Sequence, residues 1–397
     1  MFLETLRRRN PGFIQDVVRL HQEGELQPNT YVLDYRAIGR NIDLLQEEAS
    51  RLGLRVYPMT KQIGRNPAVL RLLAGKGLGR VVVVDWLGAG QVLRGGGRIG
   101  HVGHLVQVPR HGAGAVAGMD PEVWTVFSYE KAREAYQACA RLNRRQKLLV
   151  RVRREGDFFY PGQEGGVLLE DLADTALKIN ELSSVRVVGV TSFPCLLFDE
   201  KGRELAATPN LDTLVEAAGR LEQAGVAVEQ INAPGTTSTA ALEVLRSVGA
   251  THVEPGHGLT GTTPLHAFRD LPEEPAVLYL SEVSHLHGGY AYCFGGGLYV
   301  DPVVGPYPVR AMAGSGPEQV LASRYEALLP DPAGIDYYGR LRLDSPGNLE
   351  AGDTVLFGFR PQVFHTRGMV SVIERGGGPP RVMGLWDANG NPLQADP

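Results

Sequence analysis

Short runs of β-branched residues alternate with stretches of helical spacing, and this alternation constrains the fold more than any other feature of the sequence. Eight strand-like runs follow one another over about 200 residues. Eight βα units of this length are typical of an α/β protein built on a (β/α)8 TIM-type barrel. Alternation alone also permits a doubly wound open sheet, because it does not say whether the sheet closes. The predicted strands are residues 55–59, 80–85, 104–108, 124–128, 148–152, 185–190, 226–232 and 251–255.

The alternation stops near residue 275, where prolines interrupt the chain. The remaining sequence is rich in strand formers and glycine, so it predicts a second, mostly β domain. Before the first βα unit, residues 11–21 have the spacing of an amphipathic helix. The strand-like segment 30–35 suits either the rim of the barrel or the second domain. We therefore predict three parts, which are a helical extension at 1–29, a barrel at 30–275 and a C-terminal β domain at 276–397.

Composition excludes several classes of partner. Lysine and arginine number 40 against 44 acidic residues, so the net charge of −4 offers no basic surface for nucleic acid. No apolar run approaches the ~20 residues of a membrane-spanning helix. The three cysteines, Cys139, Cys195 and Cys293, lie far apart. A disulfide framework is therefore not expected, and a reducing cytoplasm fits the sequence.

Lys61 follows the first predicted strand directly, in the motif YPMTKQIGRNP. A lysine at the carboxyl end of a barrel strand is partly desolvated, which lowers its pKa and makes the amine a better nucleophile. That environment suits a lysine that forms a Schiff base. A solvated loop lysine would give the same local pattern.

The loops after the seventh and eighth strands have the composition of a phosphate site. Thr236, Thr237 and Ser238 precede a predicted helix, where hydroxyls and free N–H groups bind an anion. The next loop, EPGHGLTG, carries three glycines that let backbone approach a ligand closely. These two loops form the usual phosphate site of such barrels. An ordinary N-cap would need only one of these hydroxyls.

Glu254 ends the eighth strand, so its carboxylate would point into the mouth of the barrel. A nucleophilic lysine, a phosphate cradle and an inward carboxylate together suggest pyridoxal 5′-phosphate, whose pyridinium nitrogen a carboxylate keeps protonated. Two alternatives stay open. Glu254 could serve only in a structural salt bridge, and the barrel could bind sugar phosphates and leave Lys61 idle.

The motifs resemble those of the fold-type III pyridoxal-phosphate enzymes, the alanine racemase-like group. TYVLDYRAIGRNI (30–42) resembles the entry of that group's barrel, and EPGHG (254–258) resembles the EPGR motif of its basic amino-acid decarboxylases. The resemblance implies that Glu254 holds the pyridine nitrogen and that Gly256 and His257 contact the phosphate. Alanine racemase itself has an arginine against the ring nitrogen, so a glutamate favours a more strongly stabilised carbanion.

Seven motifs spread over nearly the whole chain resemble those of the YhfX-type bacterial proteins, a branch of this group whose expected activity is amino-acid racemisation. They are MTKQIGRNP (59–67), YPGQE (160–164), TSFPCLL (191–197), NAPGTTS (232–238), EPGHGLTGT (254–262), SEVSH (281–285) and YCFGGG (292–297). We also expect Asn232, in the motif NAPGTTS, to bind the cofactor, and Arg153 and Tyr160 to contact the phenolic oxygen of the cofactor or the substrate. One departure is Ser192, which stands where the group commonly has a histidine against the cofactor ring, so Ser192 or Phe193 must take that place.

Members of the group with a zinc-assisted reaction carry a histidine and a cysteine near the C-terminus. Arg360 and Gln362 stand at the comparable positions, so we expect no catalytic zinc. Arg360 is instead our candidate for the substrate carboxylate, which a guanidinium binds through a two-point fork. His285, His287 and His365 could bind a metal, although such histidines are more often structural.

A racemase needs a proton carrier on each face of its planar intermediate. Lys61 can serve one face, and the resemblance implies that the second group comes from the partner subunit of a homodimer with shared active sites. Tyr292 and Cys293 are the candidates, with His285 in support. Strand alternation puts these two candidates on opposite faces, so both cannot reach the substrate unless the following glycines distort the strand.

The predicted function is an amino-acid racemase or epimerase that removes and returns the Cα proton through a lysine aldimine of pyridoxal phosphate. A lyase with the same cofactor, such as a decarboxylase, aldolase or dehydratase, is the first alternative. A non-enzymatic protein that binds pyridoxal phosphate is the second, and the extra C-terminal domain argues against it.

Overall fold

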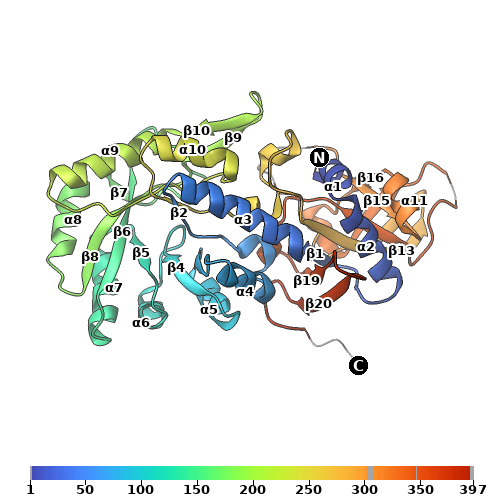
Figure 1. Cartoon of the computed structure of the whole chain (residues 1–397), viewed down its shortest axis with the longest axis horizontal. Helices are drawn as coiled ribbons and strands as arrows, with labels where there is room; N and C mark the ends of the chain where they lie inside the picture. The colour runs from blue at the N-terminus through green and yellow to red at the C-terminus, as the bar shows by residue number, and fades with distance from the viewer. Residues whose placement is uncertain (1, 302–306, 346, 394–397) are drawn as a thin grey trace. The chain divides into compact units, whose positions relative to one another are not determined.

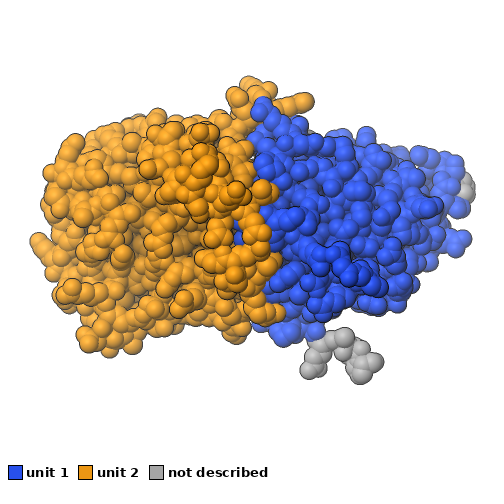
Figure 2. Space-filling model, in the orientation of Figure 1, with its two compact units in different colours: residues 1–42, 61–69, 257–397 blue, residues 43–60, 70–256 orange. Residues whose placement is uncertain are grey.

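The computed structural model describes residues 2–301, 307–345 and 347–393. The chain packs into two compact units, each built from separate stretches of sequence (Figure 2). Unit 1 comprises Met1–Ile42, Lys61–Val69 and His257–Pro397, and unit 2 comprises Asp43–Thr60 and Leu70–Gly256. The predicted domain boundaries at residues 29 and 275 remain predictions. Among the described residues, no helix is both long enough and apolar enough to cross a membrane.

Unit 2 contains the barrel. One curled sheet carries eight parallel strands, and its two end strands, β2 and β3, meet at a bridge between Met59 and Val82. The closing contact rules out the doubly wound alternative and confirms the predicted (β/α)8 barrel. In order around the sheet, the strands are β2 (Arg55–Val56), β12 (His252–Val253), β11 (Gln230–Asn232), β8 (Val185–Thr191), β6 (Gln146–Arg153), β5 (Val123–Val126), β4 (Arg98–Val102) and β3 (Arg80–Val82).

Helices follow the strands and cover the outside of this sheet, as α8 and α9 do over β6 and β8 (Figure 1). Polar caps fix where two of the helices begin, because Asp85 accepts from the N–H of Gly88 and Ser128 accepts from that of Lys131. The stretches of helical spacing between the predicted strands are confirmed as helices. The helices are α3 (Tyr35–Arg51), α4 (Pro67–Gly75), α5 (Trp86–Arg94), α6 (Ala113–Gly118), α7 (Tyr129–Arg141), α8 (Leu172–Asn180), α9 (Pro209–Gln223) and α10 (Thr239–Ser247).

The predicted strand at 104–108 is wrong, because the strand of this unit is β4 at Arg98–Val102. β4 pairs with β3 and β5 and is followed by Gly103, whose positive φ of 81° turns the chain out of the sheet. Gly100 made this segment a poor strand candidate in the sequence. A Cβ at Gly100 would lie 2.4 Å from the ring of Tyr57, so only glycine leaves room for this ring.

Unit 1 contains the second sheet, which is mostly antiparallel. Six of its strands close into a ring, because the long strand β13 pairs with β18 through its first half and with β14 through its second half. The ring confirms the predicted β character of the C-terminal part. In ring order, the strands are β13 (Val277–His287), β14 (Tyr290–Phe294), β17 (Tyr338–Arg342), β16 (Tyr325–Leu328), β15 (Arg310–Gly314) and β18 (Thr354–Phe357).

The segment predicted at 30–35 forms β1 (Thr30–Asp34) in this second sheet, so it belongs there rather than to the barrel rim. It pairs antiparallel with β13 and parallel with β19 (Met369–Glu374), which pairs in turn with β20 (Arg381–Trp386). The predicted helix at 11–21 is confirmed as α2 (Pro11–Gln22), and α1 (Phe2–Arg9) precedes it. Both helices bury apolar side chains in the core formed with β1, β13 and β18.

Gly189 in β8 provides a test of the barrel packing. A Cβ at this position would lie 1.7 Å from the backbone oxygen of Gln230 in β11. Gly189→Ala therefore forces two paired strands apart, and we expect it to lower the free energy of unfolding by more than about 4 kcal/mol. Gly219→Ala is the matched control, because that helical glycine has no atom within 4 Å of the added Cβ. We expect the control to raise stability by up to ~1 kcal/mol in urea unfolding, and equal effects of the two substitutions would contradict this account.

Candidate functional site

Polar side chains of unit 2 gather where parallel strands end. His101 lies in β4, Thr191 and Asn232 end β8 and β11, and Glu254 follows β12 directly. The carboxyl ends of parallel strands share one edge of the sheet, which is where barrel proteins carry their functional groups. The arrangement therefore brings together two predicted residues, Asn232 and Glu254, with histidines that the sequence did not single out.

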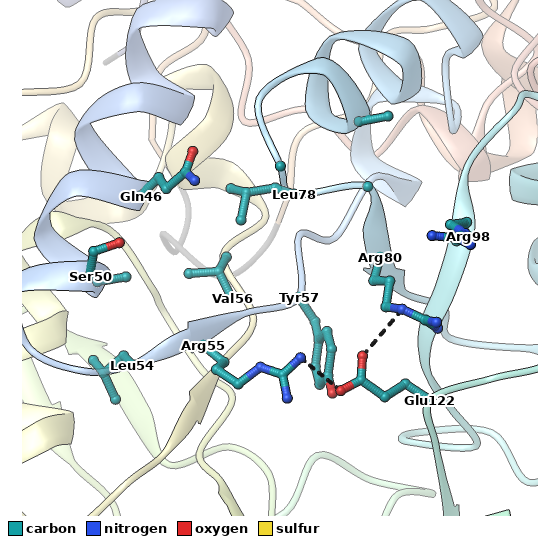
Figure 3. Close-up of a pocket in the computed structure, with 14 residues that line it drawn as sticks. Gln46, Ser50, Leu54, Arg55, Val56, Tyr57, Leu78, Arg80, Arg98 and Glu122 are labelled. Atoms are coloured by element: carbon teal, nitrogen blue, oxygen red, sulfur yellow. Dashed lines mark ion pairs between the residues drawn. The ribbon is translucent and has the colours of Figure 1, made fainter.

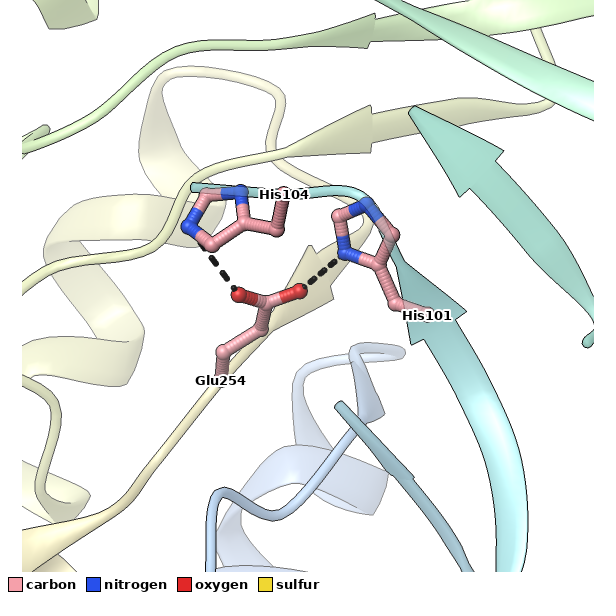
Figure 4. A group of neighbouring side chains, drawn as sticks. All are labelled: His101, His104 and Glu254. Carbon is pink, nitrogen blue, oxygen red and sulfur yellow. Dashed lines mark hydrogen bonds and ion pairs between the residues drawn. The ribbon is translucent and has the colours of Figure 1, made fainter. Parts of the chain in front are cut away.

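Glu254 is buried and is held by three side chains, two of which, His101 and His104, are drawn in Figure 4. His101 Nδ1 lies 2.5 Å from its Oε1, and Asn232 Nδ2 donates to the same oxygen at 3.0 Å. His104 Nε2 lies 3.5 Å from the other oxygen, Oε2. Burial raises the pKa of this carboxyl, but His104, His101 and the hydrogen bonds from His101 and Asn232 outweigh burial and keep its pKa below the ordinary value. Glu254 is therefore ionised inside the barrel.

The two oxygens of Glu254 differ in how they are satisfied. Oε1 accepts two hydrogen bonds, and the network continues from His101 Nε2 to Thr125 Oγ1 at 2.6 Å and from Asn232 Nδ2 to Thr191 Oγ1 at 3.2 Å. Oε2 has no hydrogen bond within the described part of the chain. Leaving a buried charged acceptor without a donor costs about 1–3 kcal/mol or more, so Oε2 is an acceptor suited to a ligand N–H group.

The same three side chains also meet the spacing of a metal site. One ligand atom each from His101, His104 and Glu254 lies within 4.8 Å of the others, and all three residues are buried. Two imidazoles and a carboxylate are donors that a divalent transition metal accepts. The expected absence of a catalytic zinc was based on Arg360 and Gln362, and it stays a prediction.

Aromatic rings and one buried arginine stand beside this network. The Phe193 ring lies 5.6 Å from that of His104, edge to face, and 6.1 Å from that of Tyr160. Arg151 is fully buried and donates to backbone oxygens of Gln163 at 2.7 Å and His104 at 3.4 Å. Burial lowers the pKa of Arg151 to about 10.

Arg153 was predicted to contact the cofactor, but Arg151 lies deeper. Arg153 is half-buried and donates to the oxygen of Gly166 at 3.3 Å, whereas the Nε of the buried Arg151 has no hydrogen bond in the described part of the chain. Both arginines share one face of β6 because they are two residues apart. Ser192 is buried without an aromatic ring to offer, so Phe193 and His104 supply the rings at this edge.

The loop between β11 and α10 has a shape that suits an anion. A Cβ on Gly235 would lie 2.6 Å from the oxygen of Leu196, so only glycine permits this turn. Ser238 is the N-cap of α10, yet its buried Oγ makes no capping bond and no other hydrogen bond among the described residues. Thr237 Oγ1 donates back to Gly235 O at 3.2 Å, and the backbone N–H of Thr236 donates to Leu196. Ser238 is therefore available to an anion at the start of the helix.

Lys61 belongs to unit 1, where it begins the short helix η1 (Lys61–Ile63). Its Nζ lies 4.7 Å from the centre of the Phe364 ring, a cation–π contact that holds the half-buried side chain. His257, predicted to contact the phosphate, has a pKa well below the ordinary value because of burial and the nearby charges of Arg360 and Lys61. Lys61, Arg360 and His257 thus share one electropositive region of unit 1.

Arg360 forms an ion pair with the buried Asp301, and Gln362 Nε2 donates to the same Oδ2 at 2.8 Å. A substrate carboxylate at Arg360 would have to share the guanidinium with Asp301. The assignment of Arg360 to the substrate remains a prediction.

The predicted acid–base residues lie on two faces of β14. Tyr292 is half-buried, and its ring stacks on His285 at 4.5 Å between centres. Cys293 is fully buried on the other face, and burial raises the pKa of its thiol to about 12. The structure brings Tyr292 and His285 together, and this geometry favours Tyr292 over Cys293 as an acid or base.

A barrel with a buried ionised carboxylate and an anion loop at one edge defines the class of this protein. Residues 33–264 match the family described as alanine racemase, N-terminal domain, and residues 278–378 match the YhfX-like C-terminal domain. The chain belongs to the alanine racemase N-terminal domain family, whose fold typically binds pyridoxal 5′-phosphate. It is 39% identical over 398 residues to "Uncharacterized protein YhfX" of Escherichia coli strain K12, and the match covers 100% of both chains.

Solved structures share the fold at low sequence identity. D-threonine aldolase from Filomicrobium marinum matches with a TM-score of 0.68 and 16% identity over 92% of this chain and 96% of that one. D-threo-3-hydroxyaspartate dehydratase from Delftia sp. HT23 matches with a TM-score of 0.67 and 14% identity over 91% of this chain and 97% of that one. Alanine racemase from Clostridium difficile 630 matches with a TM-score of 0.64 and 13% identity over 90% of this chain and 98% of that one. The fold therefore occurs with racemase, aldolase and dehydratase activities.

The pH dependence of stability tests the charge state of Glu254. Its lowered pKa contributes stability that is fully present above the unfolded value of about 4.3 and is lost as pH falls through the lower folded pKa. We expect the free energy of unfolding of the wild type to fall more steeply below pH ~5 than that of Glu254→Gln, measured in urea. The exposed Glu181→Gln serves as the control. Parallel pH profiles for the wild type and Glu254→Gln would contradict an ionised Glu254.

Proposed function

We propose that this protein is a pyridoxal-phosphate-dependent amino-acid racemase or epimerase. The observation that carries the proposal is the buried Oε2 of Glu254, an ionised acceptor that makes no hydrogen bond in the described part of the chain and lies 3.5 Å from His104 Nε2. A protonated ring nitrogen is a donor of the kind that this oxygen lacks. The family supports the cofactor, and the choice of racemase over other reactions is our own inference.

Other groups of the chain offer hydrogen-bond donors that suit the phosphate and the phenolic oxygen of the cofactor. Ser238 would hold the phosphate together with the N–H groups at the start of α10, because its buried Oγ makes no hydrogen bond among the described residues and a helix N-terminus attracts an anion. Arg151, with its unused Nε, would face the phenolic oxygen. Lys61 would supply the amine. Each assignment is a proposal about one group and implies no distance between the two units.

Bound pyridoxal phosphate withdraws electrons from a carbon that bears an amino group, and this weakens the C–H bond there. The residues of the chain do the rest. Lys61 Nζ would take the proton from one face of that carbon and Tyr292 would return one to the other. Glu254 would stay ionised and hold the positive charge of the ring nitrogen, while Phe193 and Tyr160 would exclude water.

We infer that Tyr292 acts in the partner subunit of a homodimer. Support comes from its position on the more accessible face of β14, stacked on His285. Sedimentation equilibrium tests the dimer directly. Mixing Tyr292→Phe with Lys61→Ala tests whether sites are shared, because mixed dimers would then regain one complete site.

A lyase reaction with the same cofactor is the second candidate. Glu254 favours strong electron withdrawal by the ring, which serves aldol cleavage, decarboxylation and elimination as well as racemisation. The fold similarity to an aldolase and a dehydratase keeps this alternative open.

Proton exchange in heavy water separates the two candidates. We expect the enzyme to put deuterium at Cα of at least one amino acid in a panel and to produce both enantiomers, measured by mass spectrometry and chiral chromatography. Lys61→Ala should lose both signals. Release of carbon dioxide, aldehyde or ammonia without inversion would replace the racemase with a lyase.

His101 is expected to position Glu254 and not to contact the substrate. His101→Leu removes the shortest hydrogen bond to Oε1, which frees the carboxylate to turn. A charge-assisted bond is worth about 1.5–3 kcal/mol, so we expect pyridoxal phosphate to bind roughly 10-fold more weakly in a fluorescence titration. His101→Gln should restore part of the affinity, and the exposed His111→Leu is the control. Unchanged affinity in His101→Leu, with the variant folded by thermal unfolding, would contradict this role.

A further inference from the structure

An open cavity of about 460 Å³ lies at the amino ends of β2, β3 and β4, within unit 2. It is at the opposite end of these strands from Glu254. The cavity exists because β2 and β3 are short and meet only at the bridge between Met59 and Val82, so their earlier residues diverge. Small residues leave the gap unfilled, namely Ala49, Ser50, Ala74, Gly77 and Gly79.

Three guanidinium groups and one carboxylate line this cavity (Figure 3). Glu122 pairs with Arg55 at 2.9 Å and with Arg80 at 3.4 Å, so one negative charge is shared by two cations. Arg98 forms no ion pair among the described residues. The lining thus has an excess of two positive charges, and arginine forks match the oxygens of carboxylates and phosphates.

A neighbouring buried histidine, His252, is affected by the charge of Arg55. The ring of His252 lies 5.3 Å from that of Tyr57, which lines the cavity. Burial first, and then the charge of Arg55, lower the pKa of His252 to about 3. Arg55 is the largest of the charge contributions to this shift, and the carboxylate of Glu254 acts in the opposite direction.

The remaining lining sets the size and character of a ligand. Leu54, Val56 and Leu78 offer an apolar wall, and Gln46 and Ser50 add polar groups on α3. A cavity of this volume holds a small molecule and is at the lower end of the range for ligand sites.

We propose that this cavity is a second ligand site, which binds a small organic anion with a carboxylate or phosphate monoester between Arg80 and Arg98. The bound anion takes over part of the contact that Arg80 makes with Glu122. The ion pair between Arg55 and Glu122 stays in place. The site is separate from the loop at Ser238, which lies at the carboxyl ends of the same sheet. The cavity adjoins β2. Lys61 follows this strand in the sequence, six residues after Arg55.

Isothermal titration calorimetry tests this second ligand site. The full-length protein is first loaded with pyridoxal phosphate, and inorganic phosphate is the probe. Two substitutions should change the dissociation constant of phosphate in opposite directions. Arg98→Gln removes a binding group, so the dissociation constant should rise about 10-fold. Glu122→Gln removes the competing carboxylate, so the dissociation constant should fall several-fold. Arg133→Gln, on the exposed face of α7, should leave it unchanged.

Thermal unfolding confirms that each variant is folded, and Arg80→Gln gives a second weakening variant if Glu122→Gln does not fold. Phosphate that binds equally to Arg98→Gln, Arg80→Gln and wild type overturns the proposal. So does phosphate binding that is lost only in Ser238→Ala, since that binding belongs to the loop before α10. No heat at 10 mM phosphate, about the weakest affinity of interest here, also overturns it.

Discussion

A negative charge buried inside the barrel is the constraint on which the rest of the site depends. Glu254 is removed from water, and an unpaired carboxylate in that position would cost several kcal/mol or take up a proton. His101 and Asn232 prevent this by donating to one oxygen, and they leave the other oxygen to a ligand. The hydrogen bonds of Thr125 and Thr191 then fix the two donors. The site is thus built to present one ionised oxygen in a fixed direction.

The barrel provides that arrangement through its closure. Glu254 follows β12 and His101 lies in β4, about 150 residues earlier in the sequence, yet the two side chains are in contact because the curled sheet brings these strands to facing positions. Gly189 permits the close pairing of β8 with β11, since a Cβ there would meet the backbone of Gln230, and Gly100 leaves room for the ring of Tyr57. At the opposite end, the same closure leaves β2 and β3 apart, and charged side chains line the gap. One sheet geometry therefore accounts for both the polar network and the cavity.

Much of the fold could be predicted from the sequence because local patterns carry it. β-branched runs and helical spacing gave the barrel, and the positions of Glu254 and Ser238 after strands gave two parts of the site. His101 and His104 were missed because Gly100 weakened the strand pattern of β4, although the HVGH motif was the signal that could have revealed them. Arg151 was missed because its burial depends on carbonyls of distant loops, including that of Phe193. The pairing of Arg360 with Asp301 joins residues 59 positions apart, and no local pattern indicates it.

We propose that this chain binds pyridoxal phosphate through the amine of Lys61 and that the carboxylate of Glu254 meets the ring nitrogen. The most direct test is the visible absorption spectrum of the purified protein after pyridoxal phosphate is added. The account predicts a visible band in the wild type and in the control Lys201→Ala, which borohydride removes, and no such band in Lys61→Ala. A protein that forms no band, or a Lys61→Ala variant whose band matches that of the wild type, would contradict it.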